Sequence, residues 1–112
     1  GGRHMDVLFY RSGSGKEPVR EWLRDLAKQD KRIIGEDIKT VQYGWLVGMP
    51  VVRKLDKGLR EIRSCLDRRI ARVLFTVYAG NMILLHGFIK KSRRTPAADI
   101  RLANARKADL EG

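Results

Sequence analysis

A cluster of basic residues follows directly on an apolar run near the end of the sequence. The run Leu85-His-Gly-Phe-Ile89 has the composition of a buried strand, and Thr95-Pro96 is typical of a helix start. Four cations stand between these two signals: Lys90, Lys91, Arg93 and Arg94. Cations fixed beside a helix N-terminus suit phosphate oxygens, because free N–H groups and the positive end of the helix dipole lie there. A solvated basic loop is the plainer interpretation of the same cluster.

Charged residues also interrupt two earlier strand-like segments. Side chains alternate between the faces of a strand, so Glu61 and Arg63 are expected on one face and Arg60 on the other. Arg72 lies within the apolar run at 70–77, where burial of an unpaired guanidinium costs several kcal/mol. We therefore expect Arg72 either to pair with a carboxylate such as Glu61 or to face an open cleft.

Histidine and cysteine, the two further residue types that could act in catalysis or bind a metal, are scarce. Beyond His4, the sequence has one histidine, His86, which alternation places with Leu84 and Phe88; we expect it to be structural rather than an acid–base group. The single cysteine, Cys65, is expected to be a small buried residue, and it forms no disulfide within the chain. With so few ligands, we expect no metal site and no cofactor.

The composition predicts a polyanionic partner. The 112 residues carry 24 Lys and Arg against 13 Asp and Glu, a net charge of +11. The excess lies in the second half of the chain, whereas residues 17–37 are nearly balanced, so a directed basic patch is favoured and nucleic acid is its first candidate. Residues 1–4 have the character of an expression scar, and 5–112 are expected to form one domain. No run is long and apolar enough for a membrane span, which favours the cytoplasm.

These charges must be positioned by an α+β domain. A first strand is expected within 6–11 and a helix beginning at Pro18; Asp30 is expected to cap a second helix whose apolar face carries Ile34, Ile38, Val41 and Trp45. Strand-like segments follow at 51–55, 59–66, 70–78 and 82–90, and Thr95 is expected to cap a last helix. We summarise the order as β-α-α-β-β-β-α, an antiparallel sheet packed on an N-terminal helical hairpin.

Several of these segments together resemble a known family. They are Gly58-Leu-Arg-Glu-Ile-Arg63, Arg69-Ile-Ala-Arg72, and Leu84-Leu-His-Gly-Phe-Ile-Lys-Lys91 followed by Thr95-Pro96. The chain is similar over nearly its whole length from Met5 to the phage-derived Gp49-like, HigB branch of the RelE toxin superfamily. That resemblance implies a fold of the microbial-ribonuclease type and a toxin that cleaves mRNA on the ribosome. It also implies silencing by a cognate helix-turn-helix antitoxin of the HigA type.

The resemblance assigns roles to individual residues. Arg72 matches the arginine that contacts the scissile phosphate, and Arg63 matches a basic residue of the preceding strand. Lys90 and Lys91 lie where the family has its late basic group, a candidate for stabilising the leaving oxygen, and Lys90 is the one expected in the catalytic cleft. Glu61 stands where RelE itself has a lysine; it is either a general base or the structural partner of an arginine. The C-terminal tyrosine of RelE has no counterpart after Thr95. The residues expected to hold the RNA backbone are Lys54, Lys57, Arg60, Lys91, Arg93 and Arg94.

Two other functions fit the same sequence. A non-catalytic nucleic-acid-binding module would use these charges only to grip phosphates. A protein-interaction module would instead use the helical hairpin as its main surface.

Overall fold

The fold is described here from a computed structural model of the chain, which describes residues 5–44, 52–90 and 95–112. The elements follow in the order β1 (Val7–Phe9), α1 (Pro18–Arg24), α2 (Lys28–Tyr43), β2 (Val52–Asp56), β3 (Leu59–Leu66), β4 (Arg69–Tyr78), β5 (Asn81–Lys90) and α3 (Ala97–Glu111). The predicted α+β class is confirmed. The predicted order is one strand short, because four strands, not three, separate α2 from α3.

The five strands of the described ranges form one mixed sheet in the order β1-β5-β4-β3-β2. Strands β2 to β5 form the predicted antiparallel meander, joined by tight turns at Gly58, Arg68 and Ala79-Gly80, all of which have positive φ. The first strand, β1, departs from the prediction of an antiparallel sheet, because it pairs in parallel with β5. The crossover through α1, α2 and the meander allows this parallel pairing.

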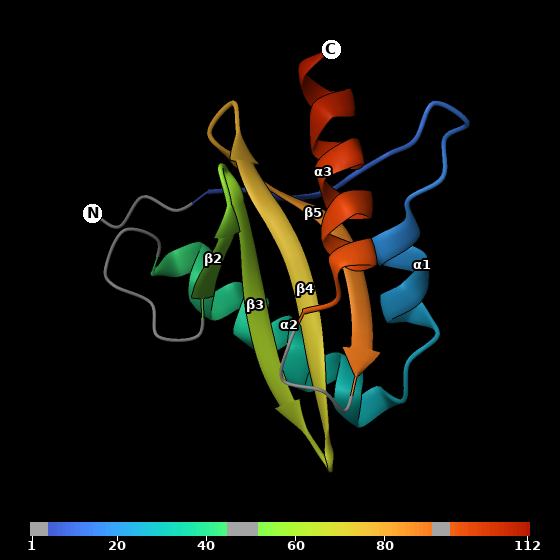
Figure 1. The fold of residues 1–112 in the computed structure, drawn as a ribbon. Helices are drawn as coiled ribbons and strands as arrows, with labels where there is room; N and C mark the ends of the chain where they lie inside the picture. The colour runs from blue at the N-terminus through green and yellow to red at the C-terminus, as the bar shows by residue number, and fades with distance from the viewer. Residues whose placement is uncertain (1–4, 45–51, 91–94) are drawn as a thin grey trace.

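Helices cover both faces of the sheet (Figure 1). On one face, α1 and α2 bury a core that includes Ile34, Ile62, Val73 and Leu84. On the other face, α3 covers a smaller core that includes Leu59, Leu74 and Leu85. Figure 1 shows α3 in front of β4 and β5, with α2 behind the sheet. Residues on neighbouring positions of β3, β4 and β5 therefore face different environments, and the register decides which charges meet α3.

The helix starts follow local chemistry only in part. Pro18 is the first residue of α1, as predicted, because its missing N–H would have no partner there. The expectation that Asp30 caps α2 is wrong: α2 begins at Lys28, and Asp30 lies in its first turn. Its carboxylate instead accepts two hydrogen bonds from Arg69 Nη2, at 3.1 and 3.0 Å. This contact ties α2 to the start of β4.

The apolar face predicted for α2 is confirmed at its described residues. Ile34, Ile38 and Val41 are buried against the sheet, while Trp45 lies outside the described residues. Trp22 packs over Gly87 of β5, where an added Cβ would lie 2.4 Å from the indole ring. Glycine at 87 therefore lets α1 approach the sheet closely, and Trp22 packs against the core.

The start of α3 differs from the prediction. The helix begins at Ala97 with Pro96 as its N-cap residue, and no side chain caps it. The prediction of Thr95 as N-cap is therefore wrong. The Thr95 hydroxyl is turned towards the sheet, where it meets the two buried charges described below.

Candidate RNA-binding and catalytic face of the sheet

The strand register gathers charged residues on the α3 side of the sheet. One row across β2, β3, β4 and β5 consists of Arg53, Glu61, Leu74 and His86. The next row consists of Arg63, Arg72 and Phe88, and the one after it of Cys65, Ile70 and Lys90. Residues paired across strands point to the same face. All four residues expected to carry catalysis, Glu61, Arg63, Arg72 and Lys90, therefore share one face of the sheet.

Glu61 and Arg72 form a buried ion pair on this face. Both side chains have no solvent exposure. Arg72 Nη1 donates to the two Glu61 oxygens at 3.5 and 3.4 Å and to Thr95 Oγ1 at 3.2 Å. The Thr95 hydroxyl donates in turn to Glu61 Oε2. Of the two alternatives left by the sequence, the structure has the pairing of Arg72 with Glu61.

Arg63 connects this buried pair to the surface. Its Nε lies 3.7 Å from Glu61 Oε1, and its side chain is 32% exposed. The carboxylate thus lies between two guanidinium groups, one buried and one accessible. Lys90, at the end of β5, is also exposed on the same face. Arg63 and Lys90 are therefore the two expected catalytic residues that solvent, and hence a polyanion, reaches in this structure.

The residues expected to hold the RNA backbone are divided between the two faces. Lys54 and Arg60 pair with each other across β2 and β3 and belong to the α1–α2 side, the face opposite Arg63. Lys57 is exposed in the turn between these strands. Lys91, Arg93 and Arg94 lie outside the described residues.

One exposed cation on the α3 side was missed. Arg53 pairs with Glu61 across β2 and β3 and so joins the row of the buried carboxylate. The alternation that separates Arg60 from Glu61 would have found Arg53 had the register of β2 been known.

His86 lies on the α3 side because of a bulge in β5. The register shifts between the pairs Leu74–His86 and Phe75–Leu84, so Leu85 is an extra residue. The expectation that His86 shares a face with Leu84 is therefore wrong, since Leu84 belongs to the other core. His86 Nε2 is 2.6 Å from Asp99 Oδ1 of α3, and its ring stacks on Phe88 at 5.2 Å. This geometry anchors the first turn of α3 on the sheet.

The prediction for Cys65 is also wrong, because its thiol is exposed. Position 65 has the parity of Arg63 and faces the α3 side near the end of β3, next to Ile70 rather than beneath a helix. Nothing in the sequence pattern distinguishes this end of the strand from the covered part.

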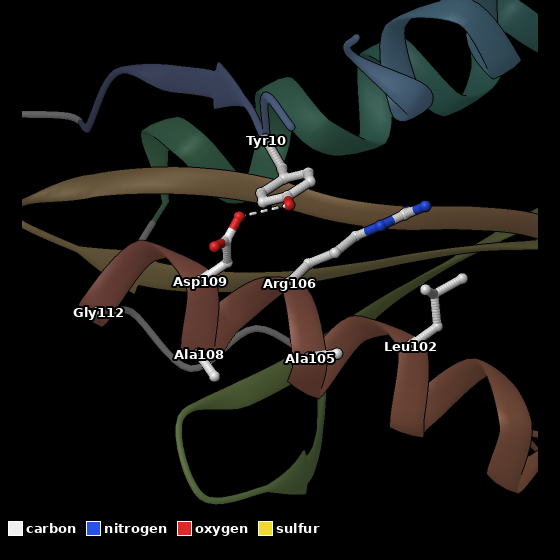
Figure 2. A pocket seen from close by; sticks show the side chains of 7 residues that line it. All are labelled: Tyr10, Leu102, Ala105, Arg106, Ala108, Asp109 and Gly112. Carbon is white, nitrogen blue, oxygen red and sulfur yellow. Dashed lines mark hydrogen bonds between the residues drawn. The ribbon is translucent and has the colours of Figure 1, made fainter. Parts of the chain in front are cut away.

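The other half of α3 borders a separate hollow of about 620 Å³, lined by Tyr10, Leu102, Ala105, Arg106, Ala108, Asp109 and Gly112 (Figure 2). The Tyr10 hydroxyl donates to Asp109 Oδ2 at 2.7 Å, and Arg106 Nη1 donates to the carbonyl of Leu85 at 2.8 Å. The hydrogen bond to Asp109 raises the pKa of Tyr10 above its usual value, and burial lowers the pKa of Arg106. Arg106 thus secures the bulge that turns His86 towards α3.

The described ranges contain no group of three or more His, Cys, Asp and Glu residues that would hold a metal ion. In the same ranges, no helix has the length and apolar character needed to cross a membrane.

A five-stranded mixed sheet with helices on both faces, and with arginines and a carboxylate gathered on one of them, is consistent with a RelE-like fold. The family model described as "Phage derived protein Gp49-like (DUF891)" matches residues 21–108. The chain therefore belongs to the Gp49-like family, which is part of the RelE/HigB-like toxin superfamily. No curated protein matches the chain.

Proposed function

We propose that this chain is the toxin of a type II toxin–antitoxin system, an endoribonuclease that cleaves mRNA on the ribosome in the cytoplasm and so inhibits translation. Family membership supports a toxin, with an antitoxin as its partner. The proposed antitoxin is a helix-turn-helix protein of the HigA type. The observation that carries the nuclease proposal is the carboxylate of Glu61 held between buried Arg72 and accessible Arg63.

The proposed reaction needs positioning and charge stabilisation. The ribose 2′-hydroxyl loses its proton to solvent as its oxygen attacks the adjacent phosphorus. The bond to the 5′-oxygen breaks, a 2′,3′-cyclic phosphate forms, and the 5′-oxygen takes up a proton from solvent. Negative charge grows on the phosphoryl oxygens, and guanidinium and ammonium groups stabilise it. Arg63 and Lys90 are the proposed phosphate contacts, because both are accessible on one face.

Glu61 and Arg72 are proposed to act through Arg63. A contact between Arg72 and the scissile phosphate is at odds with the complete burial of its side chain. The same holds for Glu61 as general base, because its carboxylate is buried and engaged by Arg72 and Thr95. A buried ion pair that fixes the position of Arg63 fits the observed contacts. Cations arranged before substrate arrives contribute more to catalysis than mobile ones.

The proposed RNA surface has further exposed cations. Arg53 lies on the face of Arg63, and Lys57 stands in the turn at the end of β2. Lys91, Arg93 and Arg94 remain proposed backbone contacts on the basis of sequence alone. Lys54 and Arg60, on the opposite face, are proposed to contact the ribosome rather than the scissile strand.

Burial of Glu61 and Arg72 also favours a second candidate, a module that binds RNA without cutting it. The two are separated by adding the purified chain to a translating extract and mapping mRNA ends. The nuclease proposal predicts new ends within translated codons, with a 5′-hydroxyl on one fragment and a cyclic or 3′-phosphate on the other. Ribosome binding without new ends would establish the binding module. Ends with a 5′-phosphate would contradict the proposed chemistry.

A further inference from the structure

The face of the molecule opposite Arg63 has a hollow of about 560 Å³ formed by β1, α1 and α2. Its lining residues are Phe9, Arg20, Leu23, Arg24, Lys31 and Gly35. Phe9 and Leu23 are partly buried and pack against the core, so they give the hollow an apolar floor. The three remaining side chains of the lining are all cations, and among the described residues no carboxylate lines this hollow.

Two of these cations are available to a partner. The side chains of Arg20 and Arg24 are 62% and 67% exposed. Arg20 pairs with Glu17 at 2.9 Å and Arg24 with Asp25 at 3.3 Å. Exposed pairs of this kind contribute little to stability, so a carboxylate from another chain replaces them at small cost. The guanidinium of Arg20 also lies 4.9 Å from the centre of the Phe9 ring, which places charge directly beside the apolar floor.

A glycine in the wall of the hollow, Gly35, also indicates a binding site. It lies in the interior of α2 and is exposed, and a Cβ added there would meet nothing within 4 Å. Glycine inside a helix costs about 1 kcal/mol relative to alanine. Neither a positive φ nor a close contact within the described chain requires that cost. In the wall of a hollow, the missing side chain leaves room for the backbone of another molecule to come close.

We infer that this hollow is the docking site for an acidic segment of the antitoxin, which seats an apolar side chain on Phe9 and Leu23. This inference rests on the proposed function. An apolar floor bordered by cations complements a peptide that carries both carboxylates and an apolar anchor, whereas a sugar-phosphate backbone is a polyanion with no apolar side chain to seat on that floor. Because the hollow lies on the α1–α2 side, an antitoxin segment docked there leaves Arg63 and Lys90 uncovered.

The test uses the antitoxin itself, identified as the protein whose co-production restores growth of cells that make this chain. Its affinity is measured for the unaltered toxin and for Gly35→Leu and Lys31→Glu. The first substitution fills the hollow, and the second reverses a charge at its edge while adding a favourable acid to the first turn of α2. We expect at least about tenfold weaker binding for each, equivalent to about 1.4 kcal/mol.

Matched controls separate the hollow from general effects. Thr40→Leu adds a similar bulk on another side of α2, and Arg101→Glu makes the same charge change on exposed α3. Both are expected to bind the antitoxin normally. All four variants are expected to remain toxic without antitoxin, which shows that each one folds.

The outcomes distinguish the inference from the proposed function. A chain that is not toxic, and that no protein neutralises, overturns both. A toxic chain whose Gly35→Leu and Lys31→Glu variants bind antitoxin as tightly as the controls overturns the inference alone. Weaker binding of Lys31→Glu to ribosomes, with antitoxin binding unchanged, assigns the hollow to RNA and also overturns it.

Discussion

Glu61 and Arg72 are diagonal neighbours on β3 and β4, and the ion pair between them has no exposure to solvent. Both charges lose their hydration on folding, so the pair contributes little net stability by itself. Its effect is positional. Thr95 is hydrogen-bonded to both partners, so the pair fixes the chain just before α3. It also holds the Glu61 carboxylate 3.7 Å from Arg63.

Replacing Glu61 with glutamine should therefore destabilise the fold. Glutamine keeps the size of the side chain but leaves the charge of Arg72 buried without a carboxylate. We expect the free energy of unfolding to fall by about 3 kcal/mol, measured by urea denaturation. The exposed Asp67→Asn in the β3–β4 turn is the control, with a change below about 0.5 kcal/mol. Equal free energies of unfolding for the two variants would show that buried Arg72 does not need the Glu61 carboxylate.

Replacing Gly87 with alanine should strain the contact between α1 and the sheet. The added methyl group would lie 2.4 Å from the ring of Trp22, so the helix must shift. We expect a loss of about 2 kcal/mol in the free energy of unfolding, as is typical of overpacking. Gly35→Ala is the matched comparison: its Cβ meets open space, and alanine favours the helix, so it should gain up to about 1 kcal/mol. A harmless Gly87→Ala would contradict the close approach of Trp22.

Tyr10 should make the stability of the fold fall as the pH becomes alkaline. Its hydrogen bond to Asp109 raises the pKa of the phenol in the folded state, so the protonated form is favoured by folding. The resulting stabilisation is complete below the pKa of an unfolded tyrosine, near 10, and is lost as pH rises through the higher folded pKa.

This loss is measured as the melting temperature between pH 8 and pH 11. Tyr10→Phe should reduce the fall in melting temperature above pH 10, whereas Tyr78→Phe, at an exposed site on β4, should leave it unchanged. Identical curves for all three proteins would exclude a role for the bond between Tyr10 and Asp109.

Local sequence signals predict parts of the fold correctly. Pro18 predicts the start of α1, the spacing of Ile34, Ile38 and Val41 predicts the buried face of α2, and the strand-like segments 59–66 and 82–90 match β3 and nearly all of β5. Alternation also placed Glu61 and Arg63 on one face. Each of these predictions depends on residues close together in the chain.

The predictions that are wrong depend instead on contacts between residues far apart in the chain or on the register of the sheet. Thr95 followed by Pro96 predicts a helix cap, but the Thr95 hydroxyl donates to Glu61, 34 positions away. Asp30 likewise meets Arg69 across 39 positions. The bulge at Leu85 reverses the parity of β5, which alternation alone does not reveal, and it moves His86 to the α3 side. Long-range polar pairing and register shifts are set by the assembled sheet rather than by local propensity.

The most direct test of the account compares the two faces of the sheet. Arg63→Ala and Lys90→Ala remove cations from the α3 side, and Lys39→Ala removes an exposed cation of α2, on the opposite side of the sheet. The measured quantity is the rate of mRNA cleavage in a translating extract, with folding checked by circular dichroism. We predict that Arg63→Ala and Lys90→Ala each lose at least about tenfold in rate, the effect of one charge-assisted phosphate contact, while Lys39→Ala cuts nearly normally. Full activity of Arg63→Ala and Lys90→Ala, or an equal loss for all three, would contradict an RNA site on the α3 face.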